Sequence, residues 1–250
     1  MNVIAKPSRD LVLMSEPKTF FASDLHLFSR RSQAPRHVTA LHAAAARASQ
    51  FVFGGDIFDF RWSQFPSSEE TTSHAVRWLD EFVGAHPHVD FHFVQGNHDC
   101  NRRFVAALDK YRITRKNLSL HTYFHRSGKN IFLHGDAADH PEMCAGRLTQ
   151  RRDHWSHDES RSRVRHVLYD LAVRARLHRL AGKVANPRRR VVHRILGYLN
   201  RVEQGPASGI EHVYFGHTHD ALANLRYGGV TFHNPGSPMP GLKFNILEVP

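Results

Sequence analysis

The sequence is poor in cysteine and has no long apolar run. Cys100 and Cys144 are the only thiols in 250 residues, which excludes a structural zinc site built on a cluster of thiolates. A chain of this length buries a core without disulfides. No stretch approaches the roughly 20 apolar residues that cross a bilayer, and residues 1–17 include charges but no apolar signal segment. We therefore expect a cytoplasmic protein.

Acidic residues are outnumbered, and the excess of positive charge lies mostly in one segment. The net charge is +11, and residues 140–209 contain fifteen Arg and Lys against six Asp and Glu. Such a segment indicates an anionic partner: a phosphorylated substrate, an anionic membrane surface or a nucleic acid. Solvated helical faces would explain the same charges. Nucleic acid is the less favoured partner, because the segment's only large aromatic residues are Trp155, Tyr169 and Tyr198.

Short apolar runs alternate with amphipathic stretches, which is typical of a layered α/β protein. Buried strands are expected at 19–23, 51–53, 91–95, 131–133 and 212–215, and further strands at 222–226, 230–233 and 243–249. Helices are expected at 35–50, 67–84, 101–111, 159–180 and 187–204. We therefore expect a single domain over residues 1–250 with a basic helical insertion, or lid, at about 137–209.

Five of the expected strands are followed directly by side chains of the metal-binding type. The motifs are Asp24-Leu25-His26, Gly55-Asp56-Ile57-Phe58-Asp59, Gly96-Asn97-His98-Asp99, His134-Gly135-Asp136 and Gly216-His217-Thr218-His219. Strand ends in an α/β sheet lie along one edge, so these side chains should share one crevice. Carboxylate, amide oxygen and imidazole suit Mn²⁺, Fe²⁺, Zn²⁺ or Mg²⁺. One such motif alone would be read as an ordinary turn, but five in this order predict a two-metal site for a phosphoryl group.

This series of motifs resembles that of the calcineurin-like metallophosphoesterase superfamily, D-x-H, G-D-x-x-D, G-N-H-D/E, H and G-H-x-H, over about residues 19–220. The resemblance implies the α/β class, with a four-layer α/β/β/α sandwich. It also implies hydrolysis of a phosphoester or diphosphate by a hydroxide that bridges two divalent ions, with Mn²⁺ the expected metal. One ion would be held by Asp24, His26, Asp56 and His219. The other would be held by Asp56, which bridges, and by Asn97, His134 and His217.

The resemblance assigns roles to further residues around these ligands. His98 would protonate the leaving oxygen, and Asp99 would orient His98. Asp59 and Asp136 would orient ligands from behind, although ordinary turn caps would look the same in the sequence.

Within the superfamily, the first two motifs are most similar to those of the UDP-2,3-diacylglucosamine pyrophosphatase group. Asp139 after the fourth motif and a helical insertion between the fourth and fifth motifs fit that group. Arg147, Arg151 and Arg152 are then candidates to bind substrate phosphate. The partner would be a phosphorylated small molecule or a lipid-linked nucleotide, with peripheral contact to the inner face of an anionic membrane. The turn at residues 234–237, Asn-Pro-Gly-Ser, is more like the small phosphodiesterase branch.

Other functions share these motifs. The alternatives within the superfamily are a nucleotide phosphodiesterase or phosphomonoesterase, a protein phosphatase and a nuclease. A metal-loaded binding or scaffold protein is the non-enzyme alternative. The intact pair of His98 and Asp99 argues against it, because a scaffold has no need of a positioned acid.

Overall fold

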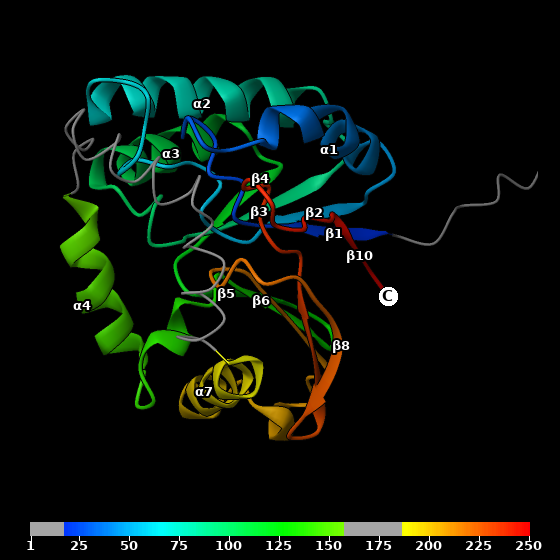
Figure 1. Cartoon of the computed structure of the whole chain (residues 1–250). Coiled ribbons are helices and arrows are strands. Elements are labelled where there is room, and N and C mark those ends of the chain that lie inside the picture. Colours follow the sequence, from blue (N-terminus) through cyan, green and yellow to red (C-terminus); the bar gives the residue numbers. More distant parts are fainter. Residues whose placement is uncertain (1–17, 158–186) are drawn as a thin grey trace, which may run out of the picture.

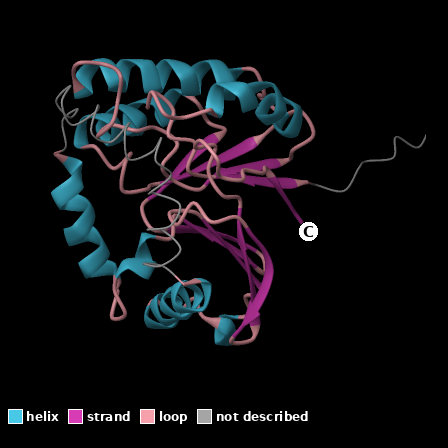
Figure 2. Cartoon of the chain, in the orientation of Figure 1, coloured by secondary structure: helices cyan, strands magenta, loops and turns pink. Residues whose placement is uncertain are grey.

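Two five-stranded sheets pack face to face, with helices on both outer faces (Figures 1 and 2). The computed structural model describes residues 18–157 and 187–250. The first sheet has the order β10 (Leu247–Val249), β1 (Thr19–Ala22), β2 (Gln50–Phe53), β3 (Asp90–Val94) and β4 (Leu118–His121). Its strands are parallel except β10, which pairs antiparallel with β1.

The second sheet has the order β5 (Phe124–Ser127), β6 (Asn130–Leu133), β7 (His212–Phe215), β9 (Val230–Asn234) and β8 (Leu222–Tyr227). Its three central strands are parallel, and β5 and β8 pair antiparallel at the edges. The expected α/β/β/α sandwich is therefore confirmed. The short strands β4 and β5, and the helix α4 described below, are not among the elements expected from the sequence.

Three helices cover the first sheet: α1 (Val38–Ala45), which follows the 3-10 turn η1 (Ala34–His37), α2 (Ser68–Gly84) and α3 (Arg102–Thr114). Ser67 caps α2, because its hydroxyl accepts a hydrogen bond of 3.1 Å from the Glu70 backbone N–H. The phenylalanines of β2 and β3 that face these helices are fully or almost fully buried. This packing fixes the direction in which the chain continues beyond the ends of both strands.

The second sheet is covered by α7 (Arg188–Arg201), whose apolar stripe of Val192, Ile195 and Leu199 is fully buried against it. The turns η2 (Asp136–Asp139) and η3 (Pro206–Ser208) and the helix α4 (Ala145–Ser156) complete the described elements. The expected helix at 187–204 is thus present, and the one at 159–180 lies outside the described residues. No helix within the described ranges is long and apolar enough to cross a membrane.

Between the sheets lies a thin aromatic and aliphatic layer. Phe21 of β1 packs on Phe132 of β6 with ring centroids 5.7 Å apart, and Phe132 stacks on Tyr214 of β7 at 5.1 Å. The two sheets are therefore in direct contact, which brings the carboxyl ends of strands from both sheets to one rim of the sandwich.

Candidate metal centre

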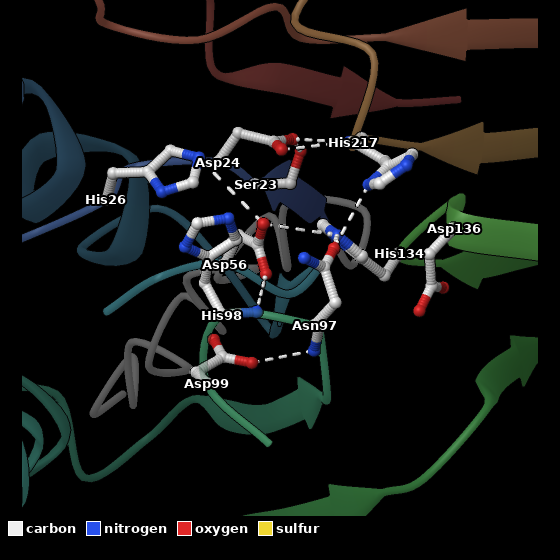
Figure 3. Close-up of polar contacts among 12 residues, drawn as sticks. Ser23, Asp24, His26, Asp56, Asn97, His98, Asp99, His134, Asp136 and His217 are labelled. Atoms are coloured by element: carbon white, nitrogen blue, oxygen red, sulfur yellow. Dashed lines mark hydrogen bonds and ion pairs between the residues drawn. The ribbon is translucent and has the colours of Figure 1, made fainter. Parts of the chain in front are cut away.

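The predicted ligands meet where β1, β2, β3, β6 and β7 end (Figure 3). The backbone there is strained: Asp24, His26, Asp56, His217 and His219 have φ values of 53°, 46°, 52°, 67° and 55°. They are five of the eight non-glycine residues with positive φ in the described part of the chain. A non-glycine residue in this region costs about 1–3 kcal/mol, and such residues concentrate at functional sites. The local strain therefore marks the strand ends as the site.

Two glycines in the motifs allow the loops to approach one another. A Cβ on Gly96 would lie 2.2 Å from Asp56 Oδ1, and one on Gly216 would lie 2.0 Å from Asp24 Oδ2. Both distances are too short for any larger residue, so glycine is required at these positions by the carboxylates beside them.

Asp24, His26 and His219 form the first ligand group, with donor atoms within 4.8 Å of one another. The Nε2 atoms of His26 and His219 face each other at 3.0 Å, and His219 Nε2 lies 3.4 Å from Asp24 Oδ1. Only one proton fits between two facing imidazole nitrogens, whereas a cation can take a lone pair from each. The group is therefore arranged for a cation.

Asp56, His134 and His217 form the second group. The side-chain oxygen of Asn97 lies 3.1 Å from His134 Nε2 and 3.1 Å from His217 Nδ1. Asp56 Oδ2 lies 3.3 Å from His134 Nε2 and 3.9 Å from His26 Nε2. Asp56 thus stands between the two groups, where it could supply a ligand to an ion in each.

The ligand side chains are held from behind by the chain itself. Asp24 accepts hydrogen bonds from the Ser23 hydroxyl at 2.6 Å and from the His217 backbone N–H at 2.8 and 3.0 Å. His134 Nδ1 lies 3.1 Å from the Gly54 carbonyl, so its Nε2 is left for the site. His217 Nε2 lies 2.8 Å from Asp139 Oδ1. Such contacts fix the tautomer and orientation of a ligating imidazole.

Asp59 rather than Asp99 orients His98. His98 Nδ1 lies 2.9 Å from Asp59 Oδ1, and Asp59 Oδ2 lies 3.4 Å from His26 Nδ1. Asp99 instead accepts hydrogen bonds from the backbone N–H groups of Gly96 at 2.6 Å and Ile57 at 2.9 Å. Asp99 therefore braces the β2 and β3 loops, a role that differs from the one expected from the sequence.

Asp136 also differs from its expected role behind the ligands. Its two carboxylate oxygens accept hydrogen bonds of 2.8 Å each from the Arg152 guanidinium, which is buried with it. Asp139, three residues later, makes the contact to His217 instead. The sequence places both carboxylates after the fourth motif but does not distinguish their directions.

The pKa shifts follow from crowded, buried carboxylates. Burial raises the pKa of Asp56, but the surrounding imidazoles outweigh this and hold it well below its ordinary value. Burial lowers the pKa of His98, yet Asp59 and Asp56 raise it to about 9. The same balance, with Asp56 as the main partner, raises the pKa of His134 to about 10. Buried negative charge of this density requires cations, and carboxylate, amide oxygen and imidazole donors fit divalent metals.

The sequence profile of the calcineurin-like phosphoesterases matches residues 17–221. The chain belongs to the calcineurin-like phosphoesterase family. Among solved structures, a dimetal phosphatase from Danio rerio is similar, with 13% identity, a TM-score of 0.43 and alignment over 89% of this chain and 88% of its own. No curated protein matches the chain.

Membership of the calcineurin-like phosphoesterases confirms the predicted enzyme class, a metal-dependent phosphoesterase. It also implies a dinuclear divalent metal centre, for which the two ligand groups are the candidates. The assignment of each residue to an ion, the choice of Mn²⁺, the cytoplasmic location and the narrower resemblance to UDP-2,3-diacylglucosamine pyrophosphatases stay predictions.

Arg61 and Trp155 are neighbours of the phosphoesterase site that the sequence analysis did not assign to it. The Arg61 guanidinium carbon lies 3.3 Å from the centroid of a Trp155 ring, and Trp155 lies 5.6 Å from the His98 ring. Arg61 also lowers the pKa of His98, in the same direction as burial and against the larger effect of the carboxylates. The position of Arg61, two residues after Asp59, is the sequence feature that could have indicated its place near the site. Trp155 had none, because it reaches His98 from the unexpected helix α4.

The three arginines expected to bind substrate phosphate are each paired with a carboxylate of the chain. Arg152 is bound by Asp136 as described, Arg151 lies 2.7 Å from Asp139, and Arg147 lies 3.4 Å from Glu142. Arg147 and Arg151 sit on the outer part of α4, where their side chains are about half exposed. Arg152 serves instead to attach α4 to the body of the phosphoesterase.

The Asn-Pro-Gly-Ser turn supports the centre. Asn234 Nδ2 donates to the Gly216 carbonyl at 2.9 Å, and Ser237 Oγ donates to the Asp24 carbonyl at 2.8 Å. The turn therefore holds the first and fifth motifs against each other. The resemblance of this turn to the small phosphodiesterase branch stays a prediction.

Proposed function

We propose that this phosphoesterase cleaves the diphosphate of a lipid-linked nucleotide of the UDP-2,3-diacylglucosamine type. The observation that supports metal-dependent hydrolysis is the pair of ligand groups with Asp56 between them. Asp24, His26, Asp56 and His219 would hold one ion, and Asp56, Asn97, His134 and His217 the other. Bound there, two divalent ions, Mn²⁺ by our proposal, supply Lewis acidity to the phosphoryl oxygens and to water.

His98 is the group we assign to the leaving oxygen. Its Nδ1 is held by Asp59 at 2.9 Å, which leaves Nε2 to carry a proton toward the substrate. Asp59, which raises the pKa of His98, favours this proton on the ring. Trp155 lies beside the His98 ring at 5.6 Å and carries the Arg61 guanidinium over its own ring.

A cavity near the site supports an acyl-bearing substrate. It has a volume of about 320 Å³ and lies between α3 and α4. Cys100, Val105 and Ala106 give it an apolar part, and its remaining lining is polar or charged: Gln95, Arg102, Asp109, Thr122, Thr149, Arg152, Asp153 and Ser156. Cys100 directly follows Asp99, so the cavity begins behind the third motif. Its volume is in the range of small-molecule sites. The stripe of α7 is buried against the second sheet, so among the described residues this cavity is the better candidate for an acyl chain.

A panel of substrates tests the proposal. With Mn²⁺, we expect the highest kcat/KM for a UDP-diacyl-sugar, with lower values for a cyclic nucleotide, an oligonucleotide, a phosphopeptide and bis-p-nitrophenyl phosphate. A higher kcat/KM for any of the soluble substrates would refute the lipid-linked assignment. Hydrolysis of none of them by metal-loaded protein would favour the binding-protein alternative.

A cavity-filling variant tests the acyl part alone. We expect Val105→Trp to raise KM for the long-chain substrate about tenfold or more, with KM for its deacylated analogue unchanged. Ile113→Trp, at an exposed position on the same helix, is the matched control. Equal KM changes for both substrates would contradict an acyl site in this cavity.

A further inference from the structure

A second group of potential metal ligands lies outside the phosphoesterase centre. His92 of β3, His121 of β4 and His125 of β5 place one donor atom each within 4.8 Å of one another. β4 belongs to the first sheet and β5 to the second, and only two residues connect them. This histidine triad therefore joins the two sheets at the edge where the chain passes from one to the other.

Some ring nitrogens of the triad lack a suitable hydrogen-bond partner within the protein. His92 Nδ1 and His121 Nε2 face each other at 3.0 Å, as His26 and His219 do in the phosphoesterase centre. His125 stacks on His92 with ring centroids 3.7 Å apart, and its Nε2 is buried without a hydrogen-bond partner. An unpartnered buried polar atom costs about 1–3 kcal/mol, which a ligand at this position would remove.

Gln50 of β2 stands behind His92 in the position of a supporting group. Its Nε2 lies 3.0 Å from His92 Nε2, and its Oε1 is buried with no partner. A half-turn of this amide would bring Oε1 onto a protonated His92 Nε2. The oxygen would then be satisfied, and His92 Nδ1 would keep a free lone pair beside His121. Metal-bound histidines commonly donate their second ring N–H to such an oxygen.

The three imidazoles are in the protonation state that binds metals. Burial is the main cause that lowers the pKa of His92 to about 4 and that of His125 to about 3, and it also lowers that of His121. All three rings are therefore neutral at pH 7, and each is only partly buried, which leaves an approach from solvent.

We propose that His92, His121 and His125 bind a third divalent transition-metal ion that clamps the two sheets together. Tetrahedral Zn–N bonds of about 2.0–2.1 Å place ligand nitrogens roughly 3.3 Å apart, so the facing pair of His92 and His121 needs to open by only a few tenths of an ångström. His125 stacks on His92 at an interplanar angle of 12°, so its ring must turn out of the stack to direct a lone pair at the same ion. A site of imidazoles without carboxylates favours Zn²⁺, Ni²⁺ or Cu²⁺ over Mn²⁺ or Mg²⁺. The triad and the carboxylate-rich phosphoesterase centre therefore differ in the metal they select.

Metal analysis of the full chain after dialysis against Zn²⁺ tests the proposal. We expect His121→Asn and His125→Asn each to hold one Zn²⁺ fewer per chain than the parent protein. The control is His42→Asn, which removes a histidine from a pair that His42 forms with His86 at 2.9 Å. The control should keep the parent's zinc content. Equal zinc content in the parent and both triad variants would overturn the proposal.

Two further measurements separate the triad from the phosphoesterase centre and from misfolding. In the Asp56→Asn chain, Zn²⁺ at about 100 times its Kd should raise Tm by roughly 5–10 °C, and His121→Asn in the same chain should abolish the shift. Gln50→Glu should tighten Zn²⁺ binding about tenfold or more, because a carboxylate is a stronger acceptor behind His92. A zinc-induced Tm rise that persists without His121, or an unchanged Zn²⁺ affinity in Gln50→Glu, would refute the triad as the site.

Discussion

Replacement of Arg152 by methionine removes the charge that compensates buried Asp136 while keeping most of the side-chain volume. The two side chains are only 6% and 5% exposed and are joined by two hydrogen bonds of 2.8 Å. Arg152 also donates to the Thr122 carbonyl, so one side chain connects α4 to the segment between β4 and β5. The variant thus leaves a carboxylate buried without its partner.

The size of the effect follows from this burial. Removal of one partner from a buried pair costs about 3–5 kcal/mol, whereas removal of both is often close to neutral. For a domain of this size, about 1 kcal/mol corresponds to 2–4 °C, so Arg152→Met should lower Tm by roughly 6–20 °C. The double variant with Asp136→Asn should recover most of this loss.

Urea unfolding of the two variants and the parent measures the free energies, and an unchanged m-value shows that the same transition is compared. KM measured below the transition of Arg152→Met separates a structural role from substrate binding. A loss of stability below about 1 kcal/mol together with a large rise in KM would refute the structural role. It would support Arg152 as a phosphate-binding residue.

Three further predictions concern the metal centre and the histidines between the sheets. Asp56→Asn should abolish hydrolysis and lower the content of both centre metals, as measured by metal analysis, because Asp56 contacts both ligand groups; full occupancy in this variant would contradict its bridging position. His98→Ala should keep both metals and reduce kcat by ~10²–10⁴-fold in steady-state assays with a poor leaving group; loss of metal would show that His98 is a ligand instead. In the presence of a chelator, the contribution of His92 and His125 to the free energy of unfolding should be fully retained above about pH 6.5 and should fall as the pH drops toward 4. Folding lowers their pKa values from about 6.5 to about 4 and about 3, so the unfolded chain binds more protons in this window. If the free energy of unfolding of His92→Gln depends on pH between 6.5 and 4 as steeply as that of the parent protein, this assignment is contradicted.

The candidate ligands can be located in the sequence because each follows an abrupt change from buried to polar residues. β2, for example, ends in Phe51, Val52 and Phe53, all fully buried, and Asp56 follows three residues later. Parallel strands of one sheet end at one rim, which explains why Asp56 after β2 lies near Asn97 after β3. The convergence of Asp56 with His134 also requires the second sheet to pack on the first.

Elements without an apolar pattern are the ones that the sequence does not reveal. α4 buries Leu148 together with Arg152 and Ser156, so its inner face has no apolar stripe to detect. β4 and β5 have four residues each, too few for a reliable alternation. The positions of Trp155 and of the histidine triad depend on these three elements, and for this reason they could not be predicted.

The sequence also does not predict which groups neighbouring carboxylate side chains face. Asp59 faces His98 and Asp99 faces backbone N–H groups, although Asp99 is the residue adjacent to His98 in the chain. Loop geometry decides which of the two carboxylates faces His98. It includes the left-handed φ of 52° at Asp56, and no local pattern of residue types predicts this geometry.

Anomalous scattering from crystals grown with Mn²⁺ tests the central claim most directly. The account predicts two manganese peaks at the rim of the sandwich, one beside Asp24, His26 and His219 and one beside Asn97, His134 and His217, with Asp56 touching both. A single peak, or two peaks of which Asp56 touches neither, would contradict it.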